Sequence, residues 1–431
     1  MSYKKNTVAY EPLGVVAACV SWNYPFHNFI SPVISALFSG NAIVLKPSEQ
    51  TAWSSLYFLD IVRGALSACG HSADPVQSVI CWPDIADHLT SHPALSHITF
   101  IGSRPIAHKV CASAAKALTP VTVELGGKDP AIILDDLTTI RKLQQVANIL
   151  LRGVFQSAGQ NCIGIERIIA LPDVHDKLLE VILPKIKAMK VGYPLPRPSS
   201  PTPDMGAMIS SRSFTHLESL ITSAVNLGAT LHTDSARHAH PIHPHGTFFP
   251  PTLLTNITPS MPIAQTELFA PIVLLMRADS LTHAIEIANS TPYALGASVF
   301  GHHHADTARC VREIKAGMVA VNDFGAYYAT SLPFGGRNGS GYGRFGGEEG
   351  LRSLCNVKAV CEDAAWARHL GIGTQIPRLL QYPIRDGAAA WEMCQGIVLV
   401  GYGIGLQARV RGLIRLAKAG VRPSPLGEAA P

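Results

Sequence analysis

The chain has 431 residues, of which 47% are hydrophobic and 15% are charged. This length and composition exclude a disordered chain and are sufficient for a large core in two domains. The formal net charge is only +5, and no basic stripe is concentrated enough to indicate nucleic-acid binding. The nine cysteines are scattered and form no C-x-x-C pair, which favours a reducing, intracellular compartment over a secreted disulfide framework.

The first third of the chain alternates short apolar runs with helical patterns. Strands are predicted at Val15–Val20, Ala42–Leu45, Val76–Ile80, Ile98–Ile101 and Val121–Leu125, and helices at Phe29–Phe38 and Trp53–Ser67. Such alternation predicts an α/β fold with a doubly wound parallel sheet. Ligands bind beyond the carboxyl ends of the strands in these sheets. Three polar segments each follow a strand, so we expect one site from Ser21–Phe26, Lys46–Glu49 and Gly102–Ser103.

A second α/β pattern runs from about Ile132 to Val321 and includes a histidine-rich stretch from His232 to His245. Histidines at this density are compatible with metal ligands. Prolines and a glycine between them break regular geometry, which favours a polar surface loop, and we expect no metal site.

After about Val360 the chain changes character. Gly396–Leu406 is an uninterrupted apolar run, but a membrane-spanning helix needs roughly 20 residues. Four basic residues follow it: Arg409, Arg411, Arg415 and Lys418. A basic amphipathic helix beside an apolar run is typical of contact with a membrane surface, and a helix packed on the protein itself is the alternative.

Cys162 lies in the segment Phe155–Gly164, between a polar turn and an apolar run. A thiolate is the strongest side-chain nucleophile near neutral pH, which suits attack on a carbonyl carbon. The alternative is a small buried hydrophobic residue, as for most lone cysteines. Gly159 and Gly164 would allow the backbone to approach a ligand closely.

Glu124 ends an apolar strand in the segment VELGGK. An acidic residue at this position fits a cleft, where desolvation would raise its pKa toward the value that a general base needs. The alternative is a carboxylate paired with Lys128.

Asn23, in SWNYPF, has a side-chain amide that could donate to an oxyanion, although it could equally be a turn residue before Pro25. Lys46 and Glu49, in KPSE, could bind a ribose diol by donating and accepting, but surface charges would give the same pattern.

Seven motifs occur in a fixed order along the chain: SWNYPF, KPSE, FIGS, VELGGK, GQNC, ELFAP and PFGGRNGSGYGR. Their order and spacing resemble the aldehyde dehydrogenase superfamily from about Glu11 to Val360. The resemblance implies that Cys162 is the nucleophile and that Glu124 activates the water that hydrolyses a thioester. It also implies an oxyanion hole formed by the Asn23 amide and the backbone N–H of Cys162.

The same resemblance implies a cofactor site for NAD, with NADP as the alternative because Arg104 could bind a second phosphate. Lys46 and Glu49 would hold the adenosine ribose. The implied roles of the other residues are pyrophosphate contact for Trp22, Gly102 and Ser103, nicotinamide-ribose contact for Glu267, ring contact for Phe269, and carboxamide contact for Leu125. A helix N-terminus following Ser103 would suit the pyrophosphate electrostatically. The implied partner is a small-molecule aldehyde.

Compared with the family, roughly the first quarter to third of a typical chain is absent here. We therefore expect an incomplete cofactor domain at 1–124, a catalytic domain at 125–335, an oligomerisation segment at 336–363 and a C-terminal extension at 364–431. A non-catalytic scaffold, inactive through this loss, is the rival hypothesis. The extension resembles a fungal, membrane-linked branch, the meiotic sister-chromatid recombination group, which implies the cytoplasm or the endoplasmic reticulum membrane, and the intact protein is expected to form a homo-oligomer.

Overall fold

The structure is a computed structural model that describes residues 3–193, 202–233, 245–325, 329–371 and 373–421. Residues 234–244, which hold most of the histidine-rich stretch, lie outside these ranges. The chain divides into two compact units. The first is Tyr10–Val357, and the second combines Met1–Ala9 with Lys358–Pro431.

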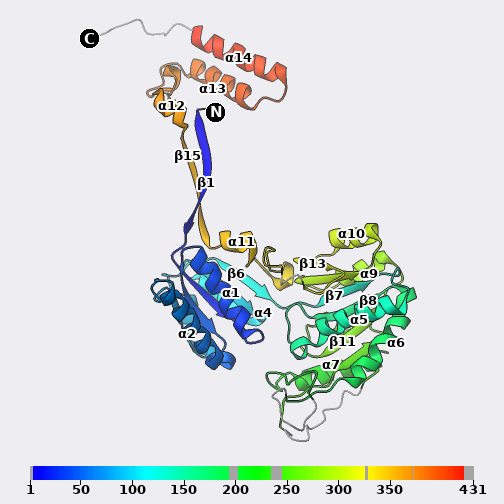
Figure 1. The fold of residues 1–431 in the computed structure, drawn as a ribbon. Coiled ribbons are helices and arrows are strands. Elements are labelled where there is room, and N and C mark those ends of the chain that lie inside the picture. The colour runs from blue at the N-terminus through cyan, green and yellow to red at the C-terminus, as the bar shows by residue number, and fades with distance from the viewer. Residues whose placement is uncertain (1–2, 194–201, 234–244, 326–328, 372, 422–431) are drawn as a thin grey trace. The chain divides into compact units, whose positions relative to one another are not determined.

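The first unit contains a six-stranded sheet, of which five strands come from the N-terminal third of the chain (Figure 1). Its order is β14 (Gly341–Tyr342), β6 (Val121–Leu125), β5 (His97–Gly102), β2 (Val15–Val20), β3 (Ala42–Pro47) and β4 (Val76–Ser78). All neighbours pair in parallel except β14, which is antiparallel to β6. The predicted α/β fold with a parallel sheet is confirmed.

Both faces of this sheet are covered by helices, which explains why its strands are almost continuously apolar. Val16 and Ala18 of β2 pack with α1 (Pro25–Phe38) and α2 (Ala52–Ala68). The alternate residues Ala17 and Cys19 belong to the cluster that contains α4 (Arg104–Ala115) on the other face. Residues two apart in a strand share a face, so one strand serves both cores.

Strand β2 lies between β3 and β5, so the strand order reverses at β2. The carboxyl ends of strands at such a reversal form the usual ligand crevice of an open α/β sheet. The segments that leave this crevice begin at Ser21, after β2, and at Ser103, after β5.

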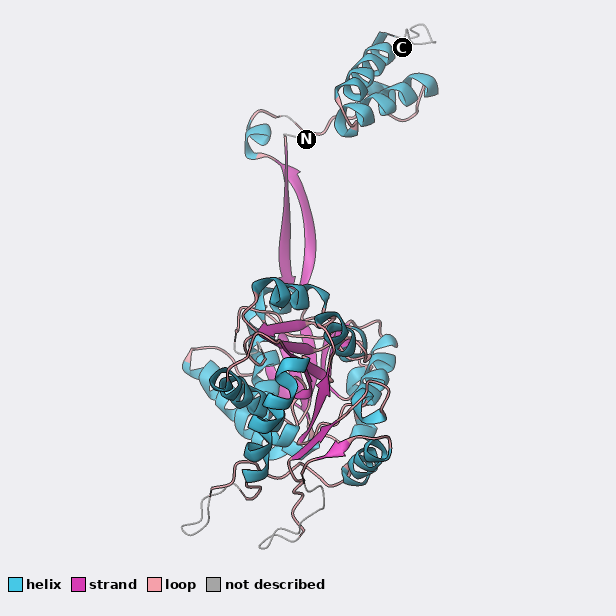
Figure 2. Ribbon diagram, turned by 90° about the vertical axis from the view of Figure 1, so that its right-hand side faces the viewer, coloured by secondary structure: helices cyan, strands magenta, loops and turns pink. Residues whose placement is uncertain are grey.

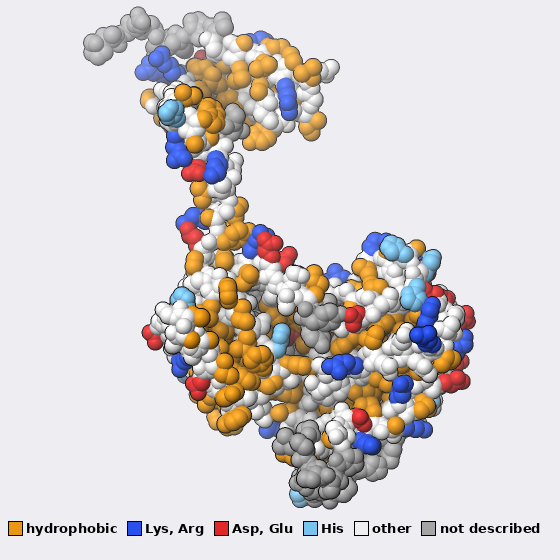
Figure 3. Space-filling model, viewed as in Figure 1, with side chains coloured by type: hydrophobic (Ala, Val, Ile, Leu, Met, Phe, Trp, Pro, Cys, Tyr) orange, Lys and Arg blue, Asp and Glu red, His pale blue; other side chains and the backbone are white. Residues whose placement is uncertain are grey.

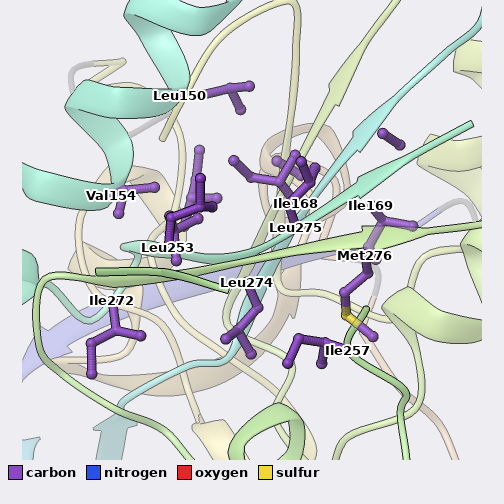
Figure 4. Close-up of a cluster of buried hydrophobic side chains, with 14 of the residues drawn as sticks. Leu150, Val154, Ile168, Ile169, Leu253, Ile257, Ile272, Leu274, Leu275 and Met276 are labelled. Atoms are coloured by element: carbon purple, nitrogen blue, oxygen red, sulfur yellow. The ribbon is translucent and has the colours of Figure 1, made fainter. Parts of the chain in front are cut away.

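The second sheet of the first unit has seven strands. Figure 2 shows the strands of this unit in magenta, with helices around them. The order of the second sheet is β13 (Met318–Val321), β12 (Gly296–Phe300), β7 (Asp129–Ile133), β8 (Ile165–Ala170), β11 (Ile272–Arg277), β10 (Thr252–Thr255) and β9 (Thr230–Leu231). Its longer helices are α5 (Ile140–Phe155), α6 (Pro172–Ala188), α7 (Phe214–Asn226), α9 (Leu281–Ala288) and α10 (His304–Glu313). Figure 4 shows side chains of α5, such as Leu150, in the core with those of the strands, such as Ile168 and Leu275.

Four short helices complete the pattern: α3 (Asp87–Thr90), α8 (Pro262–Gln265), α11 (Gly347–Arg352) and α12 (Ala365–His369). Strand β1 (Lys4–Pro12) pairs with β15 (Cys355–Asp363) in a two-stranded sheet. Helices α13 (Gly387–Tyr402) and α14 (Leu406–Val421) form a hairpin in the second unit. A Cβ on Gly412 would lie 2.8 Å from the backbone N of Val400, so glycine allows these two helices to approach closely. Among the described helices, none is both long enough and apolar enough to cross a bilayer.

Candidate active site

Glu124 and Cys162 come together where the chain passes from the six-stranded to the seven-stranded sheet. Glu124 lies near the carboxyl end of β6, and Cys162 lies in the loop between a short 3-10 turn, Gln156–Gly159, and β8. Their side chains are joined by a hydrogen bond, with the thiol as donor. Both line a cavity of about 140 Å³. A thiol, a carboxyl group and a small enclosed space are the components of an acyl-transfer site.

Burial sets the protonation of this pair. Glu124 is only 2% exposed, and this burial raises its pKa to about 8, while the hydrogen bond from Cys162 acts in the opposite direction. Burial and the nearby carboxylate of Glu124 raise the pKa of the Cys162 thiol well above its ordinary value. The thiol therefore keeps its proton at neutral pH, and Glu124 is the carboxyl group within reach of it.

Lys128 does not pair with Glu124, so that alternative interpretation of Glu124 is wrong. The Lys128 Nζ lies 2.6 Å from Oε2 of Glu166, and both side chains are buried. The Oε1 atom of Glu124 has no hydrogen-bond partner among the described residues. A buried carboxyl oxygen without a partner is costly for folding, which makes a functional role the better explanation.

Asn23 lies against the loop that carries Cys162. Its Nδ2 donates to the carbonyl oxygen of Gln160 at 3.1 Å, and its Oδ1 accepts from Ser21 Oγ at 2.8 Å. Asn23 is not among the described residues that line the 140 Å³ cavity, whereas Asn28 is. The Asn28 amide donates to Ser21 Oγ at 2.9 Å. No signal in the sequence marks Asn28, because it lies within an apolar helical pattern.

Five of the predicted cofactor residues line one cleft of about 690 Å³: Trp22, Lys46, Glu49, Gly102 and Ser103. The Nζ of Lys46 lies 3.8 Å from Oε2 of Glu49, so a donor and an acceptor face the same space. Ser103 directly precedes α4, which carries Pro105 in its first turn. Arg104 is not among the lining residues, so this geometry gives no support to a phosphate contact from it.

The other three predicted cofactor residues, Leu125, Glu267 and Phe269, do not line that cleft. Leu125 is the buried last residue of β6. A Cβ built on Gly126 would lie 1.6 Å from Oε1 of Glu267, so the glycine leaves room for this carboxyl group. Burial and the carboxylates of Glu166 and Glu124 raise the pKa of Glu267 to about 8.

Phe269 connects the region around Glu267 to the 690 Å³ cleft. Its ring meets that of Trp22 edge-on, with 5.7 Å between centroids. Its backbone has a φ of +49°, which is strained for a phenylalanine. The loop that holds it is therefore fixed by other contacts.

Glu166, which the sequence reasoning missed, supplies those contacts. Its Oε1 accepts from the backbone N of Phe269 at 2.9 Å, and both carboxylate oxygens lie 3.0 Å from the backbone N of Leu268. Beside it, the Arg167 guanidinium donates to the carbonyl oxygens of Lys128, Ile287 and Ala288. Two charged residues inside the otherwise apolar strand β8 were the available signal.

The glycines near Cys162 serve the chain itself. Gly159 has a φ of +71°, and a Cβ on it would lie 2.1 Å from the carbonyl oxygen of Ala270. A Cβ on Gly164 would lie 2.9 Å from the carbonyl oxygen of Asn161. We expected these glycines to let the backbone approach a ligand. In the structure they instead allow close packing of backbone on backbone.

Two known fungal proteins are similar to this chain over most of its length. The Schizosaccharomyces pombe aldehyde dehydrogenase-like protein C21C3 is 53% identical over 402 residues, which cover 93% of this chain and 75% of that protein. The Saccharomyces cerevisiae aldehyde dehydrogenase-like protein YHR039C is 47% identical over 424 residues, which cover 96% of this chain but only 64% of that protein. Both relatives are fungal, as the resemblance implied.

A solved structure, betaine aldehyde dehydrogenase from Staphylococcus aureus in complex with NAD+, has the same fold with a TM-score of 0.78. It is 27% identical in sequence, and the match covers 88% of this chain and 72% of that one. The model of the aldehyde dehydrogenase family matches residues 1–360. By sequence and fold, the chain belongs to the aldehyde dehydrogenase family.

Proposed function

We propose that this protein oxidises an aldehyde to the carboxylic acid with NAD(P), through a covalent intermediate on Cys162. The observation that carries the proposal is the hydrogen-bonded pair of Cys162 and Glu124 in one small cavity. The raised pKa of both groups leaves a proton on sulfur at rest, and Glu124, once it ionises near pH 8, is a carboxylate beside it that can accept that proton.

In the first half of the cycle, Glu124 takes the thiol proton as Cys162 Sγ bonds to the aldehyde carbon. The carbonyl electron pair moves to oxygen, which the backbone N–H of Cys162 and the amide of Asn23 would stabilise. For this, Asn23 must exchange its contact with Gln160 for the substrate oxygen. Each such donor is typically worth about 3–4 kcal/mol in the transition state. When bound, NAD(P) supplies the hydride acceptor, so that a thioester remains on Cys162.

Before the second half, Glu124 releases the thiol proton to solvent. It then removes a proton from water, and the resulting hydroxide adds to the thioester carbon. The carbon–sulfur bond breaks, Glu124 returns its proton to the sulfur, and the acid leaves. The Oε1 atom of Glu124 that has no partner among the described residues is free to accept the water proton.

The residues of the 690 Å³ cleft fit a dinucleotide. Lys46 and Glu49 offer a donor and an acceptor to ribose hydroxyls, and the N-terminus of α4 offers partial positive charge to phosphates. Trp22 links the cleft to Phe269 and, through that loop, to Glu267. NAD is the simpler proposal because Arg104 is not among the described residues that line the cleft; NADP remains the alternative.

Absorbance of reduced cofactor with a panel of aldehydes tests the proposal. The wild-type protein should generate NADH or NADPH, and Cys162→Ala should abolish turnover while leaving cofactor binding intact. Cys355→Ala, at another half-buried cysteine, is the matched control and should keep full activity. Equal background traces from wild type and Cys162→Ala would overturn the proposal in favour of the non-catalytic scaffold.

We also propose that the hairpin of α13 and α14 contacts a membrane surface. Several of its apolar side chains are solvent-exposed, including Trp391, Tyr402, Ile404 and Leu406. The hairpin carries four basic residues and a single acidic one, Glu392. Exposed apolar groups beside basic ones suit an interfacial helix. Homo-oligomer formation stays a prediction.

A further inference from the structure

The cavity at Cys162 lies beside a larger groove, and this inference rests on the proposed function. The groove has a volume of about 950 Å³ and shares His27, Phe334 and Phe345 with the 140 Å³ cavity. Shared lining residues mean that the two spaces are adjacent at these three side chains. A volume of this size is typical of a site for a whole small-molecule ligand rather than a reactive carbonyl alone.

One wall of the groove is an apolar stripe of α1. Phe26, Ile30 and Ile34 line it, and their spacing of four residues places them on one face of the helix. Phe26 is 57% exposed and Ile34 is 49% exposed. The stripe is separate from the one that holds α1 on its sheet, where Phe29 and Val33 are buried. Ile30 also packs partly against that core, and the Phe26 ring lies 5.1 Å from that of Phe58, so packing within the described unit explains these apolar residues only in part.

The opposite wall is also apolar. It includes Met318 and Val319 of β13 and continues through Leu332 and Pro333 to Phe334. Phe334 and Phe345 lie at the junction with the inner cavity, with 4.8 Å between their ring centroids. The groove thus offers apolar surface on both sides from its junction with the Cys162 cavity outward.

The described lining of the groove has few titratable groups, and none of them leaves an unpaired charge at pH 7. Of the described residues lining it, only His27 and Glu348 are titratable. Desolvation lowers the pKa of His27, so its ring is neutral at pH 7. Glu348 forms an ion pair with Arg352. The described lining of the inner cavity likewise has no lysine or arginine to bind a substrate carboxylate.

The geometry points to an uncharged aldehyde with a long aliphatic chain as the substrate. Its carbonyl would lie in the small cavity beside Cys162, and its chain would follow the groove between α1 and Leu332–Phe334. An aldehyde with a terminal carboxylate would lose its hydration without gaining a cation, which is unfavourable.

The first test measures kcat/KM for propanal, hexanal and decanal, and for succinate semialdehyde, with the full chain and NAD(P). Each methylene that enters an apolar groove should raise kcat/KM about fourfold until the groove is filled. Succinate semialdehyde should be the poorest substrate of the four. A flat series, or a preference for succinate semialdehyde, would overturn the inference while leaving the proposed function intact.

The second test places a charge in the groove. Ile34→Glu should lower kcat/KM for decanal at least tenfold and leave propanal, which reacts within the inner cavity, nearly unchanged. Phe38→Glu is the matched control, because Phe38 is 83% exposed on the same helix and does not line the groove. If Ile34→Glu left decanal unaffected, another part of the chain or a second copy would cover the groove and the inference would fail. Loss of turnover with every aldehyde in the wild type would instead reject the proposed function.

Discussion

A single buried carboxyl group, Glu124, determines the pH at which the proposed site is active. Its pKa is raised to about 8 because burial disfavours the charged form. A base is useful only when it has lost its proton, so the active form grows as pH rises through this value. The same burial lowers the free energy of unfolding at pH values where the carboxyl group ionises.

The rate of thioester hydrolysis should therefore increase between about pH 7 and 9 and level off above that range. Glu124→Gln should lower this rate by at least a hundredfold and remove the pH dependence, since an amide cannot take the water proton. The measurement is the steady-state rate after a single-turnover burst of reduced cofactor. A hydrolysis rate of Glu124→Gln that still rises with an apparent pKa near 8 would assign the base to another residue.

Stability gives a readout of Glu124 that is independent of turnover. When the pKa of a carboxyl group is higher in the folded than in the unfolded state, the group contributes most to the free energy of unfolding below the unfolded-state pKa. This contribution is lost as the pH rises to the folded-state pKa. Glu124→Gln should thus be more stable than wild type at pH 8, with a difference that shrinks toward pH 4. Thermal unfolding at both pH values measures it, and Glu349→Gln, at an exposed carboxyl group, is the control. An equal shift at both pH values would show that the substitution acts through packing rather than ionisation.

At the scale of elements, the sequence pattern predicts the first sheet well because local rules determine its strands. Strands β2, β3 and β5 lie where apolar runs end in polar segments, and those segments meet at one cleft. Pairing partners are different, because they depend on contacts between distant segments. The return of Gly341 to pair with Glu124 could not be deduced from any local pattern.

The role of Glu166 shows the same limit at the site. The residues Glu124 and Cys162 could be proposed from their chemical type and position on the strands. Glu166 acts only because the Leu268–Phe269 loop, about a hundred residues later in sequence, folds back onto its carboxylate. Its role depends on this tertiary contact. The only sign of that role in the sequence is a charged residue within an apolar strand.

Glu166→Gln should weaken both the fold and the cofactor site. The buried Lys128 would lose its counter-charge, and breaking such a pair costs about 3–5 kcal/mol. Lys128→Met in the same chain should recover much of that stability. The dissociation constant of NAD should still increase, because the loop that carries Phe269 loses its strongest acceptor. Calorimetric titration and thermal unfolding measure the two effects, with the exposed Glu286→Gln as control. Unchanged NAD affinity in the double variant would show that Glu166 only neutralises Lys128.

At the scale of the whole molecule, the proposed chemistry and the proposed membrane contact belong to different units. All the residues assigned to catalysis and cofactor binding lie within Tyr10–Val357. The hairpin lies in the second unit, and Figure 3 shows hydrophobic and basic side chains exposed over it. This separation means that the two proposals can be tested by independent substitutions.

The hairpin's apolar exposure has a helical pattern. Leu406, Val410 and Leu413 repeat along one face of α14 and are all exposed. The close contact with α13 uses a different face, at Gly412 and Leu416. The two helices are also joined by an ion pair, in which Arg415 Nη1 lies 3.0 Å from Glu392 Oε2. The hairpin is thus held together without its exposed apolar stripe, which is left for another surface.

We expect the full chain to float with vesicles that contain anionic lipid and to bind neutral vesicles much more weakly. Arg411→Gln with Lys418→Gln should lower the affinity about fivefold per charge, and high salt should have the same effect. Leu406→Asp should lower it about tenfold or more by removing an apolar anchor. Leu118→Asp, at a leucine that is 88% exposed in the other unit, should bind like wild type. None of these variants should change aldehyde turnover in solution, because none lies near Cys162. The wild type could instead bind no vesicles but self-associate as its concentration rises. If Leu406→Asp abolished that self-association, the stripe would be assigned to contact with a second copy of the chain.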